Sequence, residues 1–233
     1  MTTLFNLNLK KKTGVIYYSN KNIIRKFSID SQKRKLINEL NGFNWYLGEY
    51  RRKIKKIKFK SKHNQKHNYI DYPLIKATKI PFWKTLSENR EYIQILLDHY
   101  LKVWPKKNLI AYHGDLTIGN VLFDNNYSPI VIDWEFFKKR ECWGLDICHL
   151  LISSIVLPTL AKNKTYIPSS ELQLFKEIWK NFFYGKKLIY LEDPIQYLKK
   201  LNKKISKPKK NDFIFKITKQ QKKQLLEIIN NND

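Results

Sequence analysis

The chain has 233 residues, enough for one sizeable domain or two small lobes with a hydrophobic core. Hydrophobic residues make up 42% of it and aromatic residues 14%, a globular composition that excludes a disordered chain. The formal net charge of +25 attracts phosphates, nucleic acids and anionic membranes, but lysine is abundant along the whole chain, which favours a general composition bias over a designed patch.

The first third of the chain predicts a small antiparallel sheet with one helix. Residues 14–19 and 22–29 are β-rich runs joined by a short connector, which is typical of a hairpin. Residues 31–48 carry apolar side chains at helical spacing. Residues 53–60 alternate apolar side chains with lysine, as an exposed edge strand does, and residues 69–75 form the next strand.

The rest of the chain is predicted to be mostly helical. Helices are expected over residues 87–103, beginning at Ser87, and over residues 144–157. Two further helices are expected to begin at capping boxes, which are Ser170 with Gln173 and Thr218 with Gln221. The expected architecture is therefore α+β, with a small β-rich lobe over residues 1–76 and a larger helical lobe over residues 77–233.

Several features favour a cytoplasmic protein with reduced thiols. The two cysteines, Cys142 and Cys148, have neither the number of a disulfide framework nor the spacing of a zinc site. The N-terminus has no apolar signal segment. The longest apolar stretch, residues 145–161, contains Asp146 and reads as a buried helix rather than a membrane span.

The segment that points to function is YHGDLTIGNVLFDNNYSPIVIDWE, residues 112–135. Residues 121–123 and 130–132 are two β-runs separated by turn residues, so a hairpin is expected. Symmetric pairing of its arms would place Asn120 opposite Asp133, with Cβ atoms about 5 Å apart on one face. An amide oxygen and a carboxylate at that separation suit Mg²⁺.

Asp115 lies five residues before Asn120 and reaches the same end of the hairpin, where it is free to accept a proton. A lone Asp at a strand end is usually a turn residue, and we interpret His113 as a packing and hydrogen-bonding residue. The combination of HGD, an Asn five residues later and an Asp thirteen residues after that is rare by chance. We therefore favour a functional interpretation of the combination.

These residues resemble a known family. HGDLTIGNVLF followed by VIDWE resembles the aminoglycoside phosphotransferase and choline kinase group of small-molecule kinases, and more distantly the protein kinases. IDWEFFKKRECWGLDICHLL is similar to the choline/ethanolamine and thiamine kinase version of the motif. The resemblance implies a two-lobed protein-kinase-like fold, in which residues 1–76 bind the nucleotide and residues 77–233 carry catalysis and acceptor binding.

The resemblance also implies roles for the polar residues of the motif. Asp115 would be the catalytic base, and Asn120 and Asp133 would hold Mg²⁺ against the phosphates of ATP. Asp146 would brace the catalytic loop. Glu135 stays open between holding metal or water and facing the acceptor.

A kinase also needs a cation on the α- and β-phosphates and a carboxylate that holds this cation. Arg25 and Lys26 point to opposite faces of their strand, and periodicity does not decide between them. Glu39 is the only acidic residue between positions 31 and 48 and is the natural ion-pair partner, although a solvated helix residue is an equal alternative.

Two further parts of the site are placed by analogy. Residues 72–77, with Leu74 and Ile75, fall where the backbone of the hinge would pair with adenine, whereas a glycine-rich phosphate loop is missing. The acceptor pocket is expected within residues 143–200, where Trp143 is an aromatic candidate, although core packing is the favoured role of the aromatic residues there.

The leading hypothesis is an ATP- and Mg²⁺-dependent kinase for a small-molecule hydroxyl on choline or ethanolamine, thiamine, a sugar or an aminoglycoside. The alternatives are a nucleotide-binding pseudokinase and a basic nucleic-acid-binding protein. Specific nucleic-acid binding is not expected, because no zinc-finger, helix-turn-helix or RRM pattern is present. The positive charge, most concentrated over residues 198–210, leaves open a peripheral contact with an anionic membrane surface, and the oligomeric state is left open.

Overall fold

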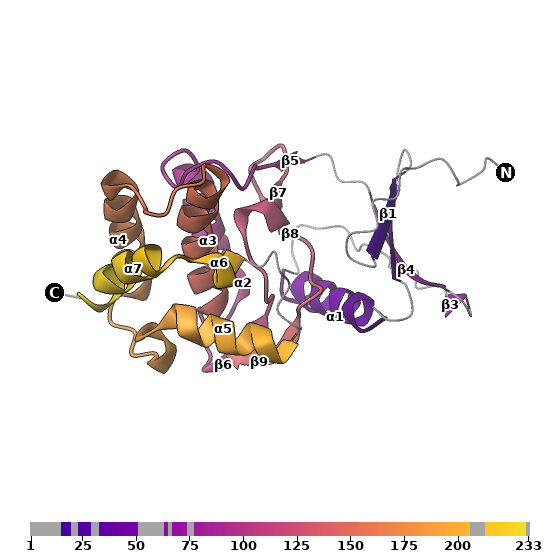
Figure 1. Ribbon diagram of the computed structural model, residues 1–233. Coiled ribbons are helices and arrows are strands. Elements are labelled where there is room, and N and C mark those ends of the chain that lie inside the picture. Colours follow the sequence, from indigo (N-terminus) through magenta and orange to yellow (C-terminus); the bar gives the residue numbers. More distant parts are fainter. Residues whose placement is uncertain are drawn as a thin grey trace.

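The structure is a computed structural model (Figure 1) that describes residues 15–19, 23–28, 33–50, 63–64, 67–73, 77–205 and 213–231. A four-stranded antiparallel sheet comes first, in the order β1-β2-β4-β3. Its strands are β1 (Val15–Ser19), β2 (Ile23–Ser28), β3 (His63–Asn64) and β4 (His67–Pro73). Helix α1 (Lys33–Glu49) packs against β2 and β4. The predicted hairpin, helix and strand are confirmed, whereas the predicted edge strand at 53–60 lies outside the described residues.

The helices form the other side of the molecule in Figure 1. They are α2 (Arg90–Val103), α3 (Leu145–Ala161), α4 (Ser169–Phe183), α5 (Pro194–Ile205), α6 (Phe213–Lys216) and α7 (Lys219–Asn230). Short 3₁₀ turns occur at η2 (Ile118–Asn120) and η3 (Ile189–Leu191). The α+β layout predicted from the sequence is therefore confirmed.

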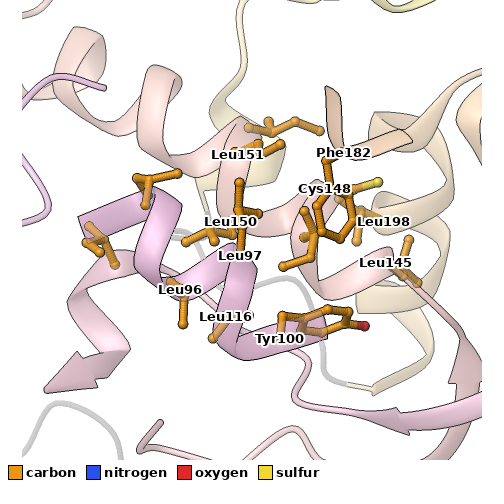
Figure 2. Packing of buried hydrophobic residues seen from close by; sticks show 14 of the residues in the cluster. Leu96, Leu97, Tyr100, Leu116, Leu145, Cys148, Leu150, Leu151, Phe182 and Leu198 are labelled. Carbon is orange, nitrogen blue, oxygen red and sulfur yellow. The ribbon is translucent and has the colours of Figure 1, made fainter. Parts of the chain in front are cut away.

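Helix α3 is the centre of the core. All of its first twelve residues, 145–156, are buried. Figure 2 shows Leu150 of α3 close to Leu97 of α2, and both side chains are buried. Within the described residues, no helix is both long and apolar enough to cross a bilayer. The apolar run at 145–161 is thus a buried helix, as its polar interruptions predicted.

There are two further small sheets in the described part of the chain. One has the order β5-β7-β8, with β5 (Thr78–Lys79), β7 (Val121–Phe123) and β8 (Pro129–Val131). The other pairs β6 (Leu109–Tyr112) with β9 (Lys138–Cys142). The segment between β6 and β7 carries the HGD motif, and the end of β8 leads into IDWE.

The helix starts were predicted with mixed success. Thr218 and Gln221 form the predicted capping box of α7. The box at Ser170 is wrong, because α4 begins one residue earlier, after Pro168, and no side chain caps it. The start at Ser87 is also wrong: α2 begins after Asn89, because the hydroxyl of Ser87 donates to the carboxylate of Glu171 on α4 instead.

Candidate active site

Asp146 holds the start of the loop between β6 and β7. Its two carboxylate oxygens accept hydrogen bonds from the backbone N–H groups of His113 (2.9 Å) and Gly114 (3.1 Å). Burial raises the pKa of Asp146 to about 7, although these two N–H groups act in the opposite direction. Gly114 has φ +88°, and a Cβ there would lie 2.6 Å from the backbone oxygen of Phe136, so the position requires glycine.

His113 ties the same loop to the segment before Asp133. Its Nε2 lies 2.9 Å from the backbone oxygen of Ile132, and its Nδ1 accepts the N–H of Asp115 at 3.2 Å. Because a carbonyl only accepts, the ring proton is on Nε2 and the imidazole is neutral. Burial lowers the pKa of His113 to about 4, which keeps it neutral at physiological pH. The geometry is that of a packing and hydrogen-bonding residue.

Asp115 and Asn120 lie in contact. The Asn120 amide nitrogen donates to the backbone oxygen of Asp115 (2.8 Å) and lies 3.3 Å from its carboxylate. Since the nitrogen is engaged, the Asn120 amide oxygen is the atom suited to a cation. The Asp115 side chain is 38% exposed, so a bound hydroxyl can reach it.

His149 approaches Asp115 from the core side. Its Nδ1 donates to the backbone oxygen of Leu116 (3.1 Å), and its Nε2 lies 3.8 Å from the Asp115 carboxylate. Sequence reasoning assigned no role to His149. The signal was its spacing, because a residue three positions after Asp146 lies on the same helix face.

Lys26 of β2 gathers three carboxylates around one buried ammonium. Its side chain is 2% exposed, and its Nζ lies 2.7 Å from Asp133, 3.1 Å from Glu39 and 3.1 Å from Glu135. Of the two cations left open by the sequence, Lys26 therefore reaches this cluster. The side chain of Arg25 lies outside the described residues.

The charge on Lys26 decides the ionisation of Asp133. Burial opposes ionisation of this carboxyl, but the adjacent ammonium of Lys26 outweighs burial and holds its pKa below the ordinary value. The Asp133 side chain is 35% exposed and thus borders solvent. Asp133 is an accessible carboxylate that stays ionised.

Helix α1 is joined to the loop that follows Asp133. Lys35 Nζ lies 3.2 Å from the Glu135 carboxylate, and the Asn38 amide donates to the Glu135 backbone oxygen at 3.1 Å. Glu135 is buried and contacts both Lys26 and Lys35. These two ion pairs explain why a carboxylate is present at this position without any contact to the molecule that accepts the phosphate. Sequence reasoning missed Lys35, which lies one turn before Glu39 on the same helix, and Asn38, which directly precedes Glu39.

The hairpin differs from the predicted register by one residue. Val121 pairs with Val131, and the Ile132 N–H donates to the Asn120 backbone oxygen at 3.0 Å, so Asn120 lies opposite Ile132 and not opposite Asp133. Asp133 adopts φ +68°, a left-handed conformation that non-glycine residues rarely take. The chain bends at Asp133, and this bend accompanies its contact with Lys26.

The oxygen atoms at this end of the hairpin are of the chemical type that Mg²⁺ prefers. Within the described residues, no group of three His, Cys, Asp or Glu side chains is arranged to hold a metal ion. The donors are instead the accessible carboxylate of Asp133 and the amide oxygen of Asn120. Magnesium typically takes one or two protein oxygens and completes its shell with water and phosphate.

The remaining predicted site residues are placed differently. Leu74 and Ile75 lie outside the described residues. Trp143 is buried and stacks on Phe182, with ring centres 5.6 Å apart. Its position is in the core, which agrees with the packing role favoured for the aromatic residues.

Comparison with known families supports this arrangement. The model of the phosphotransferase enzyme family matches residues 68–139, which include Asp115, Asn120 and Asp133. No curated protein matches the sequence. Residues 68–139 thus carry the signature of this family, and the resemblance of the sequence to the aminoglycoside phosphotransferase and choline kinase-like family is confirmed.

The fold also occurs in a solved structure. A choline/ethanolamine kinase family protein from Mesorhizobium loti superposes with a TM-score of 0.50 at 12% identity, over 94% of this chain and 90% of that one. Choline kinase LicA from Streptococcus pneumoniae gives a TM-score of 0.48 at 12% identity, over 94% and 90%. The bifunctional kinase-methyltransferase WbdD gives 0.46 at 13% identity over 97% of this chain, which spans only 49% of WbdD. The predicted two-lobed protein-kinase-like fold is confirmed.

Proposed function

We propose that the protein transfers the γ-phosphoryl group of ATP to a hydroxyl of a small molecule, with Mg²⁺ as the required cation. The observation that carries the proposal is the Lys26 cluster, in which one buried ammonium contacts Glu39 and Asp133. Kinases of this fold need a lysine held by a helix carboxylate on the α- and β-phosphates, close to a carboxylate for the metal.

Lys26 is suited to the phosphates because Glu39 fixes its position from α1. Asp133 and Asn120 would hold Mg²⁺, which when bound neutralises charge on the β- and γ-phosphates. The remaining work of the protein is positioning, because phosphoryl transfer needs little covalent help from side chains.

Asp115 is the proposed base. Its carboxylate is partly exposed, and the Asn120 amide lies against one of its oxygens. In this role it accepts the proton of the acceptor hydroxyl as the hydroxyl oxygen bonds to the γ-phosphorus and the bond to the ADP oxygen breaks. Asp146 and His113 support the reaction by fixing the loop that carries Asp115.

Choline, ethanolamine or thiamine is the favoured class of acceptor, because the sequence after Asp133 continues with Trp and Glu as in those kinases. Two of the similar structures are named as choline or choline/ethanolamine kinases. Sugars and aminoglycosides remain in the test set. We place the reaction in the cytoplasm, where ATP is available.

The test is a screen for ADP release with Mg²⁺ and ATP across amino alcohols, thiamine, sugars and aminoglycosides, together with calorimetric titration of Mg²⁺ and ATP. Asp115→Asn should lower transfer by about 10²–10⁴-fold and leave nucleotide binding intact. Asp133→Asn should abolish Mg²⁺-dependent nucleotide binding. Asp98→Asn, at an exposed carboxylate on α2, is the control and should change neither.

Each other outcome contradicts a defined part of the proposal. Transfer by Asp115→Asn at the wild-type rate would remove the base assignment. Mg²⁺-dependent binding of ATP without transfer to any acceptor would leave a nucleotide-binding protein without turnover. A protein that does not bind ATP would remove the whole proposal.

A further inference from the structure

Three segments meet beside one buried tryptophan, Trp143. They are residues 105–109 before and at the start of β6, residues 138–142 of β9, and residues 184–189 after α4. The backbone N–H of Trp143 donates to the backbone oxygen of Asn108, in the first segment, at 3.3 Å. Lys186 Nζ, in the third segment, lies 5.7 Å from the Trp143 ring centre. We call these three segments the basic face; β6 and β9 lie along the lower edge of the molecule in Figure 1.

The basic face is more positive than the composition of the chain explains. Seven of its sixteen residues are Lys or Arg, against 45 of 233 in the whole sequence. They are Lys106, Lys107, Lys138, Lys139, Arg140, Lys186 and Lys187. Its one acidic residue, Glu141, is neutralised by Lys138 at 3.2 Å. The face is therefore a concentrated anion-attracting surface.

The cations are also crowded. Lys106, Lys107, Lys139, Arg140 and Lys187 are exposed. Partial burial, and then the charge of Lys106, lower the pKa of Lys186. Repulsion of this kind is relieved when an anionic partner approaches.

Two large exposed apolar side chains belong to the third segment of the basic face. Tyr184 is 87% exposed and Ile189 is 81% exposed, the highest values for large hydrophobic residues in the described part of the chain. They bracket the lysine pair at 186 and 187 in one turn, which Gly185 permits with φ +66°. Exposed apolar residues beside cations are typical of surfaces that bind a membrane interface.

We propose that the basic face docks the protein on an anionic membrane, with its lysines and arginine on lipid phosphates and with Tyr184 and Ile189 inserted at the headgroup level. The apolar residues favour a bilayer over a nucleic acid, because an aliphatic side chain gains nothing from a phosphate backbone and cannot stack as an aromatic ring does. The proposal is independent of the reaction proposed above.

The test is co-sedimentation of the full chain with vesicles of phosphatidylcholine alone and of phosphatidylcholine mixed with phosphatidylserine. Each lysine near an anionic surface contributes about fivefold to binding, so Lys106→Gln/Lys187→Gln should bind about 25-fold more weakly. The control is Lys162→Gln/Lys164→Gln, which removes the same charge. Those lysines are exposed and follow the C-terminal end of α3, whereas β9 precedes its N-terminal end, about 25 Å away.

A third variant tests insertion of the turn. Tyr184→Ser/Ile189→Ser keeps every charge and changes only exposed side chains. It should still lower the affinity for the serine-lipid vesicles at physiological salt. Equal weakening by the control would show bulk attraction by the net charge and overturn the proposal. No binding to serine-lipid vesicles, binding unchanged by the third variant, or tighter binding of duplex DNA through the same lysines at the same salt would overturn it as well.

Discussion

Replacement of Lys26 by Met tests the centre of the site. The Lys26 side chain is 2% exposed, and its ammonium lies within 2.7–3.1 Å of three carboxylates. Met keeps most of the buried aliphatic part of this side chain and removes the charge. Breaking a buried ion pair by removing one partner costs about 3–5 kcal/mol. Asp133 is partly exposed and Glu135 keeps Lys35, so the cost falls chiefly on Glu39. We expect the free energy of unfolding near neutral pH to fall by about 3 kcal/mol or more.

The assay is urea unfolding followed by tryptophan fluorescence. Lys35→Met is the matched control, because Lys35 is 16% exposed and contacts one carboxylate at 3.2 Å. It should cost less than Lys26→Met, because Glu135 keeps its contact with Lys26 when Lys35 is removed. The double variant Lys26→Met/Glu39→Gln should recover part of the lost free energy of unfolding, because the buried carboxylate of Glu39 is then replaced by a neutral amide. If Lys26→Met costs no more than Lys35→Met, the electrostatic account of the cluster is refuted.

The remaining predictions concern three other positions. The Nδ1 of His149 donates to the Leu116 backbone oxygen, beside Asp115, so His149→Asn, whose amide can replace this donor, should keep most of kcat, whereas His149→Leu, which has no donor, should lower kcat about tenfold; equal loss in both variants would show that the ring itself is required and not this hydrogen bond. Gly114→Ala meets both a φ of +88° and a contact at 2.6 Å, and should lower the unfolding free energy by more than Gly185→Ala, whose φ of +66° is combined with open space. Burial lowers the pKa of His99 from 6.5 to about 4, so the unfolded chain binds the extra proton between these values and stability falls as pH drops. The wild type should lose about 1.4 kcal/mol per pH unit more than His99→Gln over that range, and a constant difference in urea unfolding would contradict this.

The parts of the fold that follow from local chemistry were predictable. The first hairpin and helix α1 are marked by apolar periodicity, and the HGD and IDWE segments by carboxylates at strand ends. Local patterns alone could not decide between Arg25 and Lys26, because a strand places neighbours on opposite faces and only the packing of α1 shows which face meets Glu39. The sequence therefore limited the choice to two residues, and tertiary structure resolved it.

Other features depended on contacts that no local pattern contains. Asp133 takes a left-handed backbone beside Lys26, and the hairpin register differs by one residue from the symmetric pairing. Ser170 has the composition of a capping box, but the helix begins before it. In each case the residue type was informative and its geometry was set by a distant segment.

The position of Glu135 has a consequence for how this protein can vary. One side chain and its backbone oxygen meet Lys26, Lys35 and Asn38 on two separate segments. A neutral residue at 135 would remove the carboxylate that the half-buried Lys35 contacts, whereas Lys26 would keep Glu39 and Asp133, so the loss of stability would fall on helix α1. Related proteins without a glutamate at position 135 should therefore also lack the lysine at position 35, whereas they should keep the lysine at position 26.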